Sequence, residues 1–305
     1  MLIAVLIAIT VFQFAIISLI FIRQSKAHES KSVKSSNTPA SVSQFYNENT
    51  GKFLAVYGEI IQAFRTTNIN DYLQYTIQSA ALKNDMKIID AGCGVAGPAC
   101  FFAKNLPGLF IDSCTVSKVQ ADLASIKVQE NKVDTQVKIT LGDYHQLDEL
   151  FENDQYDRVI FLESFGHSNN KTKLIDACWK VLKPGGKMYI KDLFIRESNN
   201  EWEQLRINHI CSQINQAYEY QVGDLNDVLS TIRKQGFIVN FIRPPQVDTG
   251  LFEHLTISND FQNLFNIGKI DSWEDYVFPI DFFEILVEKP LHNIEDQKHL
   301  YFMNR

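Results

Sequence analysis

The stretch MKIIDAGCGVAGPA, residues 86–99, decides the fold of this 305-residue chain. It opens with MKIIDA, an apolar run of the kind that forms a buried strand. Gly92, Gly94 and Gly97 follow in the spacing G-x-G-x-x-G, which lets the backbone turn sharply and approach a ligand. Pro98 suits the first turn of a helix. The stretch therefore predicts a strand, a ligand-contacting turn and a helix.

Outward from this stretch, apolar β-type runs alternate with helical segments. Helices are expected from about Pro98, Ser117, Thr172 and Asp224. This alternation predicts an α/β fold with a doubly wound, Rossmann-like, mostly parallel sheet. Two insertions, roughly residues 196–223 and the segment before the last strand, are expected to build the substrate pocket. The other expected strands are LFIDSC (109–114), VKITL (137–141), DRVIFLE (157–163), KMYIKDLF (187–194), FIVNFI (237–242) and FFEILVE (282–288).

The first 22 residues, MLIAVLIAITVFQFAIISLIFI, form an almost uninterrupted apolar run. As a helix they would span roughly 33 Å, which is enough to cross a bilayer. Basic residues follow the run, so we expect a single-pass membrane anchor with the rest of the chain facing the cytosol. A cleaved signal peptide, with a site at residues 25–27, and a buried helix remain the alternatives.

After this anchor the sequence predicts three parts. Residues 23–44, rich in Ser and Lys, are expected to be a flexible linker. Residues 45–290 are expected to form the main domain, which starts with two aromatic-rich helices, and residues 291–305 a C-terminal tail. In the first helix, a stripe of residues has helical spacing, at Phe53, Tyr57, Ile60, Ile61 and Phe64.

Composition and charge exclude several classes of protein. The net charge is −7, with +3 on residues 1–44 and −10 on the remainder, so the main domain is a poor binder of nucleic acid. A mean hydropathy of −0.13 excludes a multi-span membrane protein. The five cysteines include no C-x-x-C pair, which argues against a structural metal site or a disulfide framework and for a reducing, cytosol-like compartment.

The glycine-rich turn allows two interpretations. Asp112 lies 20 residues beyond Gly92, so the stretch also meets the dinucleotide-binding fingerprint. However, Asp90 directly before the glycines would repel a pyrophosphate and attract a sulfonium cation. About 85 residues also precede the first strand, whereas a nicotinamide enzyme more often opens with it. These features favour S-adenosylmethionine as the cofactor over NAD.

Further motifs carry a resemblance to a known family. Gly142-Asp143 closes the third strand and LKPGG (182–186) precedes the fifth, as in class I S-adenosylmethionine-dependent methyltransferases. Over residues 45–245 the chain resembles the prenyl diphosphate, sterol and tocopherol methyltransferases. The segments that carry this resemblance are DAGCGVAGPA (90–99), SCTVSKVQADLA (113–124), FLESFGHSNN (161–170) and RINHICSQI (206–214).

The resemblance implies a class I methyltransferase fold and a set of cofactor-binding residues. Most class I methyltransferases have Asp or Glu at the end of the second strand, where this chain has Thr115, and Thr115 and Gln120 could supply neutral hydrogen bonds instead. Asp112 either assists or is a strand-end carboxylate in water. The implied cofactor-binding residues are Asp90, Gly92, Gly94, Gly97, Thr115, Gln120, Gly142, Asp143 and Tyr144.

The candidate catalytic residues are Glu163 and His167, which follow the fourth strand where the methyl group should lie. Methylation of an alkene carbon produces a carbocation, which a carboxylate stabilises and from which a base removes a proton. Aromatic faces also stabilise a cation. The candidate substrate-binding residues are Tyr46, Phe53, Tyr57 and Phe165. Alternatively, Glu163 binds the cofactor, His167 is a surface or capping histidine, and the aromatic stripe belongs to the core.

The sequence thus predicts a membrane-bound enzyme that C-methylates a small lipophilic isoprenoid, either a prenyl diphosphate or a sterol-like lipid. We expect no resident metal, although Mg²⁺ could accompany a diphosphate. The alternatives are an O- or N-methyltransferase of a small metabolite or phospholipid head group, and an inactive membrane-tethered binding module. The oligomeric state is left open.

Overall fold

The computed structural model describes residues 37–62, 68–247 and 277–292, which belong to one unit that begins at Asn37. The predicted membrane anchor, residues 1–22, and most of the predicted C-terminal tail lie outside the described residues. Within the described ranges, no helix combines the length and the hydropathy that a membrane span requires.

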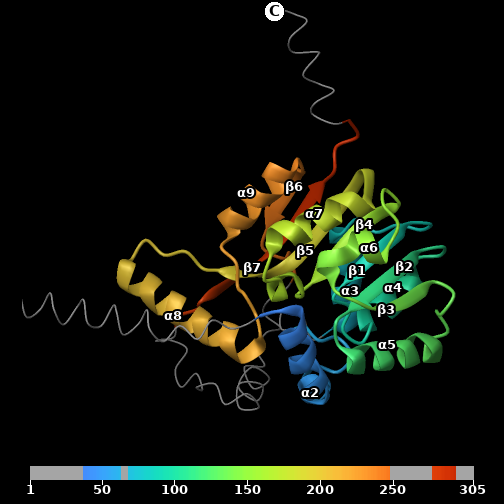
Figure 1. Ribbon diagram of the computed structural model, residues 1–305, viewed down its shortest axis with the longest axis horizontal. Coiled ribbons are helices and arrows are strands. Elements are labelled where there is room, and N and C mark those ends of the chain that lie inside the picture. Colours follow the sequence, from blue (N-terminus) through green and yellow to red (C-terminus); the bar gives the residue numbers. More distant parts are fainter. Residues whose placement is uncertain (1–36, 63–67, 248–276, 293–305) are drawn as a thin grey trace, which may run out of the picture. The chain divides into compact units, whose positions relative to one another are not determined.

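A single sheet organises the described part of the chain (Figure 1). Its seven strands are ordered β3-β2-β1-β4-β5-β7-β6. The first five strands are parallel, whereas β7 runs antiparallel to both β5 and β6. The prediction of a doubly wound, mostly parallel sheet is therefore confirmed. The strands are β1 (Lys87–Ala91), β2 (Phe110–Thr115), β3 (Val137–Leu141), β4 (Tyr156–Leu162), β5 (Leu182–Ile195), β6 (Ile238–Arg243) and β7 (Ile280–Glu288).

Helices cover both faces of this sheet. Helices α3 (Ile69–Ser79), α4 (Gly97–Asn105) and α5 (Lys118–Glu130) pack on one face. Helix α6 (Leu147–Leu150), helix α7 (Lys171–Val181) and helix α9 (Leu225–Gln235) pack on the other. The predicted starts at Ser117 and Asp224 are N-caps in the structure, because each side chain accepts a hydrogen bond from the first turn of its helix. Short 3₁₀ turns occupy Tyr144–Gln146 and Phe165–His167.

The N-terminal region differs from the sequence prediction at two points. Helix α2 (Pro39–Tyr57) begins inside the expected flexible linker, 23–44, because Thr38 caps it and Pro39 suits its first turn. It also ends earlier than expected. Gly58 closes it at φ +63°, so the predicted continuation through Ile60 and Ile61 is wrong.

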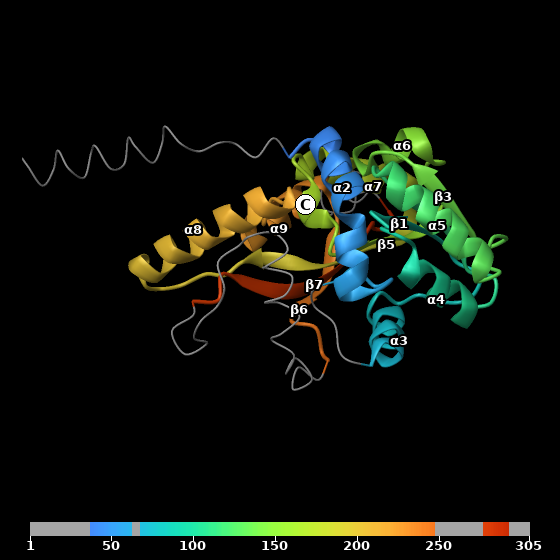
Figure 2. The same ribbon diagram turned by 90° about the horizontal axis from the view of Figure 1, so that it is seen from below.

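The insertion between β5 and α9 contains helix α8 (Glu201–Tyr218), which packs against the ends of β5 and β7 at one end of the sheet (Figures 1 and 2). Strand β5 begins at Leu182, so the segment LKPGG lies at the start of the strand rather than before it. The insertion thus leaves the sheet at the carboxyl end of β5, beside the carboxyl end of β4.

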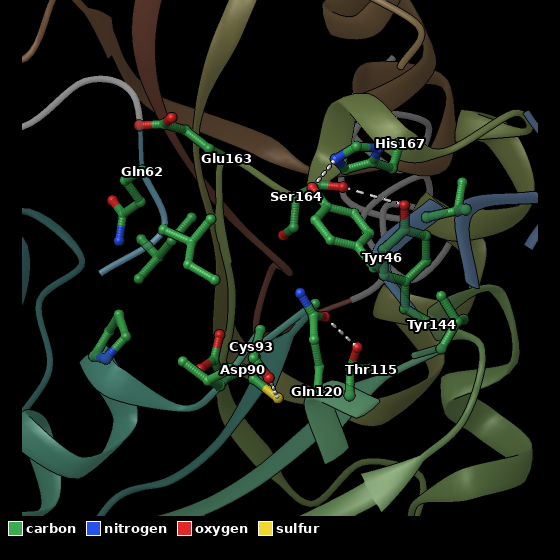
Figure 3. Close-up of a pocket in the computed structure, with 18 of the residues that line it drawn as sticks. Tyr46, Gln62, Asp90, Cys93, Thr115, Gln120, Tyr144, Glu163, Ser164 and His167 are labelled. Carbon is green, nitrogen blue, oxygen red and sulfur yellow. Dashed lines mark hydrogen bonds between the residues drawn. The ribbon is translucent and has the colours of Figure 1, made fainter. Parts of the chain in front are cut away.

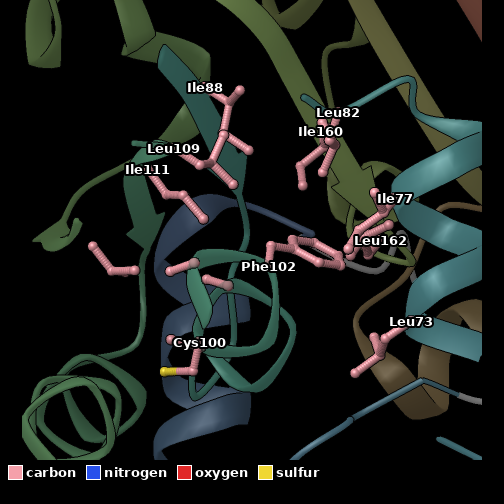
Figure 4. Packing of buried hydrophobic residues seen from close by; sticks show 14 of the residues in the cluster. Leu73, Ile77, Leu82, Ile88, Cys100, Phe102, Leu109, Ile111, Ile160 and Leu162 are labelled. Atoms are coloured by element: carbon pink, nitrogen blue, oxygen red, sulfur yellow. The ribbon is translucent and has the colours of Figure 1, made fainter. Parts of the chain in front are cut away.

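The core on the α3–α5 face is closely packed around Phe102 (Figure 4). This side chain is fully buried, together with Ile88 from β1 and Ile111 from β2. Because an aromatic ring buries a large apolar area, Phe102 is among the residues that hold α4 against the sheet.

We expect Phe102→Ala to lower the free energy of unfolding by about 3–5 kcal/mol, because it opens a cavity that the neighbouring side chains fill only in part. Ile126→Ala on α5 is the control, since Ile126 is 53% exposed and should change stability by no more than about 0.5 kcal/mol. Urea unfolding of both variants measures the difference. Equal losses would show that Phe102 is not part of the core.

Candidate functional site

A pocket opens at the carboxyl ends of β1 to β4 (Figure 3). Parallel strands end at the same edge of a sheet, so residues far apart in the sequence meet here. Helix α2 supplies Pro39, Val42 and Tyr46 to the same pocket. The other lining residues are Glu59, Ile61, Gln62, Asp90, Gly92, Cys93, Gly94, Val95, Pro98, Thr115, Val116, Gln120, Asp143, Tyr144, His145, Leu162, Glu163, Ser164 and His167.

The glycine-rich turn forms the floor of this pocket. Gly92 has a φ of +82°, which favours glycine, and a Cβ there would lie 2.5 Å from the Cβ of Ser164. The Ser164 hydroxyl donates a 2.5 Å hydrogen bond to the Ala91 carbonyl. Gly94 also adopts a positive φ, of +55°. The turn therefore requires a residue without a side chain where β1 and β4 approach each other.

Asp90 is buried at the end of β1, and its Oδ2 has no hydrogen-bond partner among the described residues. Burial raises the pKa of this carboxyl to about 7. An unpaired, buried carboxylate is unfavourable unless a donor or a cation reaches it. Asp90 therefore presents an acceptor to a ligand in the pocket.

Thr115 and Gln120 form one polar wall. The Thr115 hydroxyl donates a 2.9 Å hydrogen bond to Gln120 Oε1, and both side chains are buried. Asp112 lies elsewhere: its Oδ2 accepts a 2.6 Å hydrogen bond from the Tyr156 hydroxyl in the interior. Neither interpretation of Asp112 was correct, because it neither lines the pocket nor faces water.

The loop after β3 supplies Asp143 and Tyr144. Asp143 Oδ1 accepts hydrogen bonds from the His145 backbone N–H, at 2.9 Å, and from its Nδ1, at 2.6 Å. Tyr144 donates a 3.1 Å hydrogen bond to the carbonyl of Ser164. These contacts tie the β3 loop to the end of β4, on the same side of the pocket as Thr115.

Glu163 lies at the pocket wall with a φ of +57°, an unusual conformation for a residue other than glycine. Its Oε1 forms a 2.5 Å ion pair with Nζ of Lys191, a fully buried residue of β5. Burial alone would lower the pKa of Lys191, but Glu163 and Tyr72 raise it overall. Nζ also bonds to the Tyr72 hydroxyl, which donates to Gln62 at 2.6 Å. The pair holds the Glu163 carboxylate at the wall.

His167 is buried beside Tyr46. Its Nδ1 donates a 2.8 Å hydrogen bond to the Glu219 carbonyl, since a carbonyl oxygen only accepts. Burial lowers the pKa of His167 to about 4, so the ring is neutral at pH 7. Its Nε2 therefore accepts the 2.8 Å hydrogen bond from the Tyr46 hydroxyl. The bond to Glu219, the residue that ends α8 (Glu201–Tyr218), caps that helix, so the capping interpretation holds, whereas burial of His167 rules out a surface position.

The structure places most of the predicted residues around this pocket, but not all. Gly97 instead allows the backbone at Glu59 to pack on α4, and a Cβ at Gly142 would overlap Leu150. Phe53 and Tyr57 lie in an aromatic cluster next to Tyr46, outside the pocket lining. Phe165 is 1% exposed and packs in the core, so its prediction as a substrate-binding residue is wrong.

Several site residues were not predicted. Lys191 lies in the apolar strand segment KMYIKDLF, 28 residues after Glu163. A charged residue within an apolar strand is the feature of the sequence that could have identified it. Ser164 lies between the two predicted catalytic residues, where its packing on Gly92 could not be anticipated. Gln62 was assigned to a helix that ends at Tyr57.

This arrangement fits S-adenosylmethionine. The unpartnered oxygen of Asp90 provides a charge for a cation, the glycines leave space at the turn, and the neutral pair Thr115–Gln120 can hydrogen-bond hydroxyl groups. In the described part of the chain, no cluster of three or more His, Cys, Asp or Glu side chains could hold a metal ion.

Comparisons with known proteins agree with this geometry. A sterol 24-C-methyltransferase of Gibberella zeae is 26% identical over 168 residues, 53% of this chain and 42% of its own. The chloroplastic tocopherol O-methyltransferase of Arabidopsis thaliana is 25% identical over 200 residues, 56% of each chain. The chain thus spans about half the length of these relatives.

Solved structures show the same fold at low identity. Geranyl diphosphate C-methyltransferase from Streptomyces coelicolor, solved with Mg²⁺, geranyl diphosphate and S-adenosylhomocysteine, has a TM-score of 0.56 and 17% identity over 71% of this chain and 78% of its own. Phosphoethanolamine N-methyltransferase 2 of Haemonchus contortus has a TM-score of 0.62 and 19% identity over 83% of this chain and 61% of its own.

The family model for mycolic acid cyclopropane synthetase matches residues 63–243. The match covers more than half of the 305 residues, and the two relatives described above are named as methyltransferases. The chain therefore belongs to the mycolic acid cyclopropane synthetase family, and it has the Rossmann-like fold of S-adenosylmethionine-dependent methyltransferases.

Proposed function

We propose that this enzyme methylates an alkene carbon of an uncharged, sterol-like isoprenoid. The observation that carries the proposal is the charge of the pocket. Its acidic lining residues are Glu59, Asp90, Asp143 and Glu163, and no Lys or Arg of the described residues lines it. Such a wall favours a positively charged transition state and disfavours an anionic acceptor.

This charge pattern separates the two isoprenoid classes that the sequence left open. A diphosphate would need several cationic groups or Mg²⁺ to offset its charge. Lys191 is committed to Glu163 and fully buried, so it does not offer that charge to the pocket. A neutral lipid needs no such partner, and Val42, Ile61 and Leu162 provide apolar contacts for it.

The proposed mechanism assigns a task to each side chain. S-adenosylmethionine, when bound, supplies an electrophilic methyl group. Asp90 binds the cofactor's positive charge, and Thr115 and Gln120 bind its hydroxyl groups. Glu163, held in place by Lys191, stabilises the cation that develops on the acceptor and takes its proton. Tyr46 and His167 shape the acceptor side and exclude water.

Residues 1–22 are part of this proposal as a membrane anchor. A lipid acceptor resides in a membrane, and S-adenosylmethionine is cytosolic, so an anchored domain facing the cytosol would reach both. Support comes from the apolar run itself and from the basic residues Arg23, Lys26, Lys31 and Lys34 that follow it.

A second candidate function is N-methylation of an amine that binds as its ammonium ion and gives up a proton before its nitrogen attacks the methyl group. The same acidic lining would attract an ammonium group, and Tyr46 and His167 form a neutral pair that could hydrogen-bond it. The acceptor that becomes methylated, and the atom that carries the methyl group, distinguish the two functions.

Radiolabelled methyl transfer tests the proposal directly. The full chain, purified from the membrane fraction, is incubated with labelled S-adenosylmethionine and a Δ24-sterol, farnesol, geranyl diphosphate or phosphoethanolamine. We expect label on a carbon of the neutral isoprenoid, with no effect of EDTA. Label on phosphoethanolamine would favour the second function, and label on geranyl diphosphate alone would overturn the charge argument. Recovery of the chain as a soluble protein would remove the anchor from the proposal.

We expect cofactor affinity to depend on pH through Asp90. The folded pKa of about 7 lies above the ordinary 3.8, so the empty site is protonated below pH 7. A cationic cofactor requires the charged form, and its own amino group stays protonated below pH 7. The Kd for S-adenosylmethionine should therefore rise as pH falls from 7 to 5, by at most about tenfold per unit.

Calorimetry of wild type and Asp90→Asn measures this dependence. The Asn variant should bind more weakly at pH 7.5 and should lose most of the pH dependence below it. An equally steep dependence in the variant would assign the effect to another group, such as Asp192, whose pKa burial raises to about 6.

Glu163→Gln should lower kcat by about 100-fold while the KM for S-adenosylmethionine changes little, since Gln keeps the shape but loses charge and basicity. Glu284→Gln is the matched control. Glu284 is a fully buried carboxylate that accepts hydrogen bonds from Tyr75, Ser79 and Tyr189 and does not line the pocket. Steady-state kinetics with the methylated acceptor compares them. A raised KM with an intact kcat would instead make Glu163 a cofactor-binding residue.

A further inference from the structure

The loop that carries His167 is held by a segment far away in the sequence. Residues 219–221, directly after α8, contact this loop through both backbone and side chains. The Gln221 N–H donates a 2.7 Å hydrogen bond to the carbonyl of Gly166. Lys171 Nζ donates to the carbonyls of Ser168 and Gln221, at 3.2 and 3.0 Å. The insertion between β5 and α9 thus reaches the reaction centre.

Tyr220 packs directly on the imidazole. The two rings meet edge to face with centroids 4.4 Å apart, and Tyr220 is 6% exposed. A Cβ on Gly166 would overlap the Tyr220 ring, so the ring fits only because residue 166 is glycine. The position of Tyr220 therefore determines the space that is available to His167.

Asp192 fixes Tyr220 in this position. The Tyr220 hydroxyl donates to Asp192 Oδ1, which also accepts a 2.7 Å hydrogen bond from the Leu193 N–H. Asp192 Oδ2 accepts a 3.1 Å hydrogen bond from the N–H of Gly166 in the His167 loop. One buried carboxylate at the end of β5 thus connects the ring above the imidazole and the backbone that carries it.

Glu219 links the same region to α2. This residue ends α8 in a left-handed conformation, with a φ of +47°, and its carbonyl accepts the hydrogen bond from His167 Nδ1. Its side chain accepts a 2.9 Å hydrogen bond from the Ser41 hydroxyl, on the helix that also carries Tyr46. Both partners in the Tyr46–His167 hydrogen bond are therefore held by one residue of the insertion.

We propose that Asp192 and Tyr220 are positioning residues that hold His167 in one orientation and one tautomer, with Nε2 as the acceptor toward Tyr46. Neither touches the cofactor-binding turn, and neither lines the pocket. They act through His167: if the Tyr220 ring moved, the imidazole could rotate away from the Glu219 carbonyl and exchange its two nitrogens. The proposal rests on the proposed function only in placing His167 at the reaction centre.

Nuclear magnetic resonance of the full chain, labelled with ¹⁵N-histidine, tests the tautomer without an acceptor. His167→Gln identifies the His167 signals by their loss. In wild type we expect the Nδ1–H tautomer at pH 7. Tyr220→Phe keeps the ring but removes the hydrogen bond to Asp192, and it should shift the tautomer ratio by about fivefold. Asp192→Asn should shift it in the same direction and serves as the second variant.

Tyr156→Phe is the matched control, because it removes a buried hydrogen bond from a tyrosine to Asp112 outside the pocket. It should cost similar stability in urea unfolding and leave the His167 signals unchanged. If Tyr220→Phe and Asp192→Asn leave the tautomer unchanged, or if Tyr156→Phe shifts it equally, the proposal is overturned. Failure to methylate an isoprenoid would refute the proposed function and leave this result intact.

Discussion

The close approach of two strand ends, at Gly92 after β1 and Ser164 after β4, is the constraint on which the site depends. The two chains meet where a side chain at residue 92 would leave only 2.5 Å to the Ser164 Cβ, and the Ser164 hydroxyl bonds to the β1 backbone. Because β1 and β4 are neighbours in a parallel sheet, this contact brings Asp90 and Glu163 to one edge. The cofactor and the reaction centre then share one pocket.

The two carboxylates at this edge, Asp90 and Glu163, differ in the partners that the protein provides for them. Asp90 has one unpartnered oxygen and a raised pKa, so a ligand must supply its counterpart. Glu163 already has a partner, because its Oε1 forms an ion pair with Nζ of Lys191. Asp90 is therefore suited to bind a cationic cofactor, and Glu163 is suited to stabilise a cationic transition state.

Local patterns predicted the fold, and most of the expected cofactor-binding residues line one pocket. The strand ends, the N-caps at Ser117 and Asp224 and the residues Asp90, Thr115 and Asp143 all follow from motifs within a few positions of each other. The acceptor half was predicted less well, because its geometry depends on distant contacts. The chain turns at Glu163, which has a positive φ, and the Phe165 side chain enters the core. The alternation of strands and helices in the sequence does not show which way the side chain of Phe165 points. The ion pair of Glu163 with Lys191 joins two strands, and no spacing rule anticipates it.

The two halves of the pocket come from different parts of the fold. The sheet edge holds residues that suit one cofactor, and these come from β1, β2, β3 and β4. The acceptor side is built from α2 and from the end of α8, which meet at Glu219 and at the Tyr46–His167 hydrogen bond. Helix α2 is also tied to the cofactor side, because Ser43 and Asn47 form hydrogen bonds with residues 116–119 after β2. Under the proposed function, the acceptor is therefore best inferred from the charge and packing of α2, the His167 loop and residues 219–221.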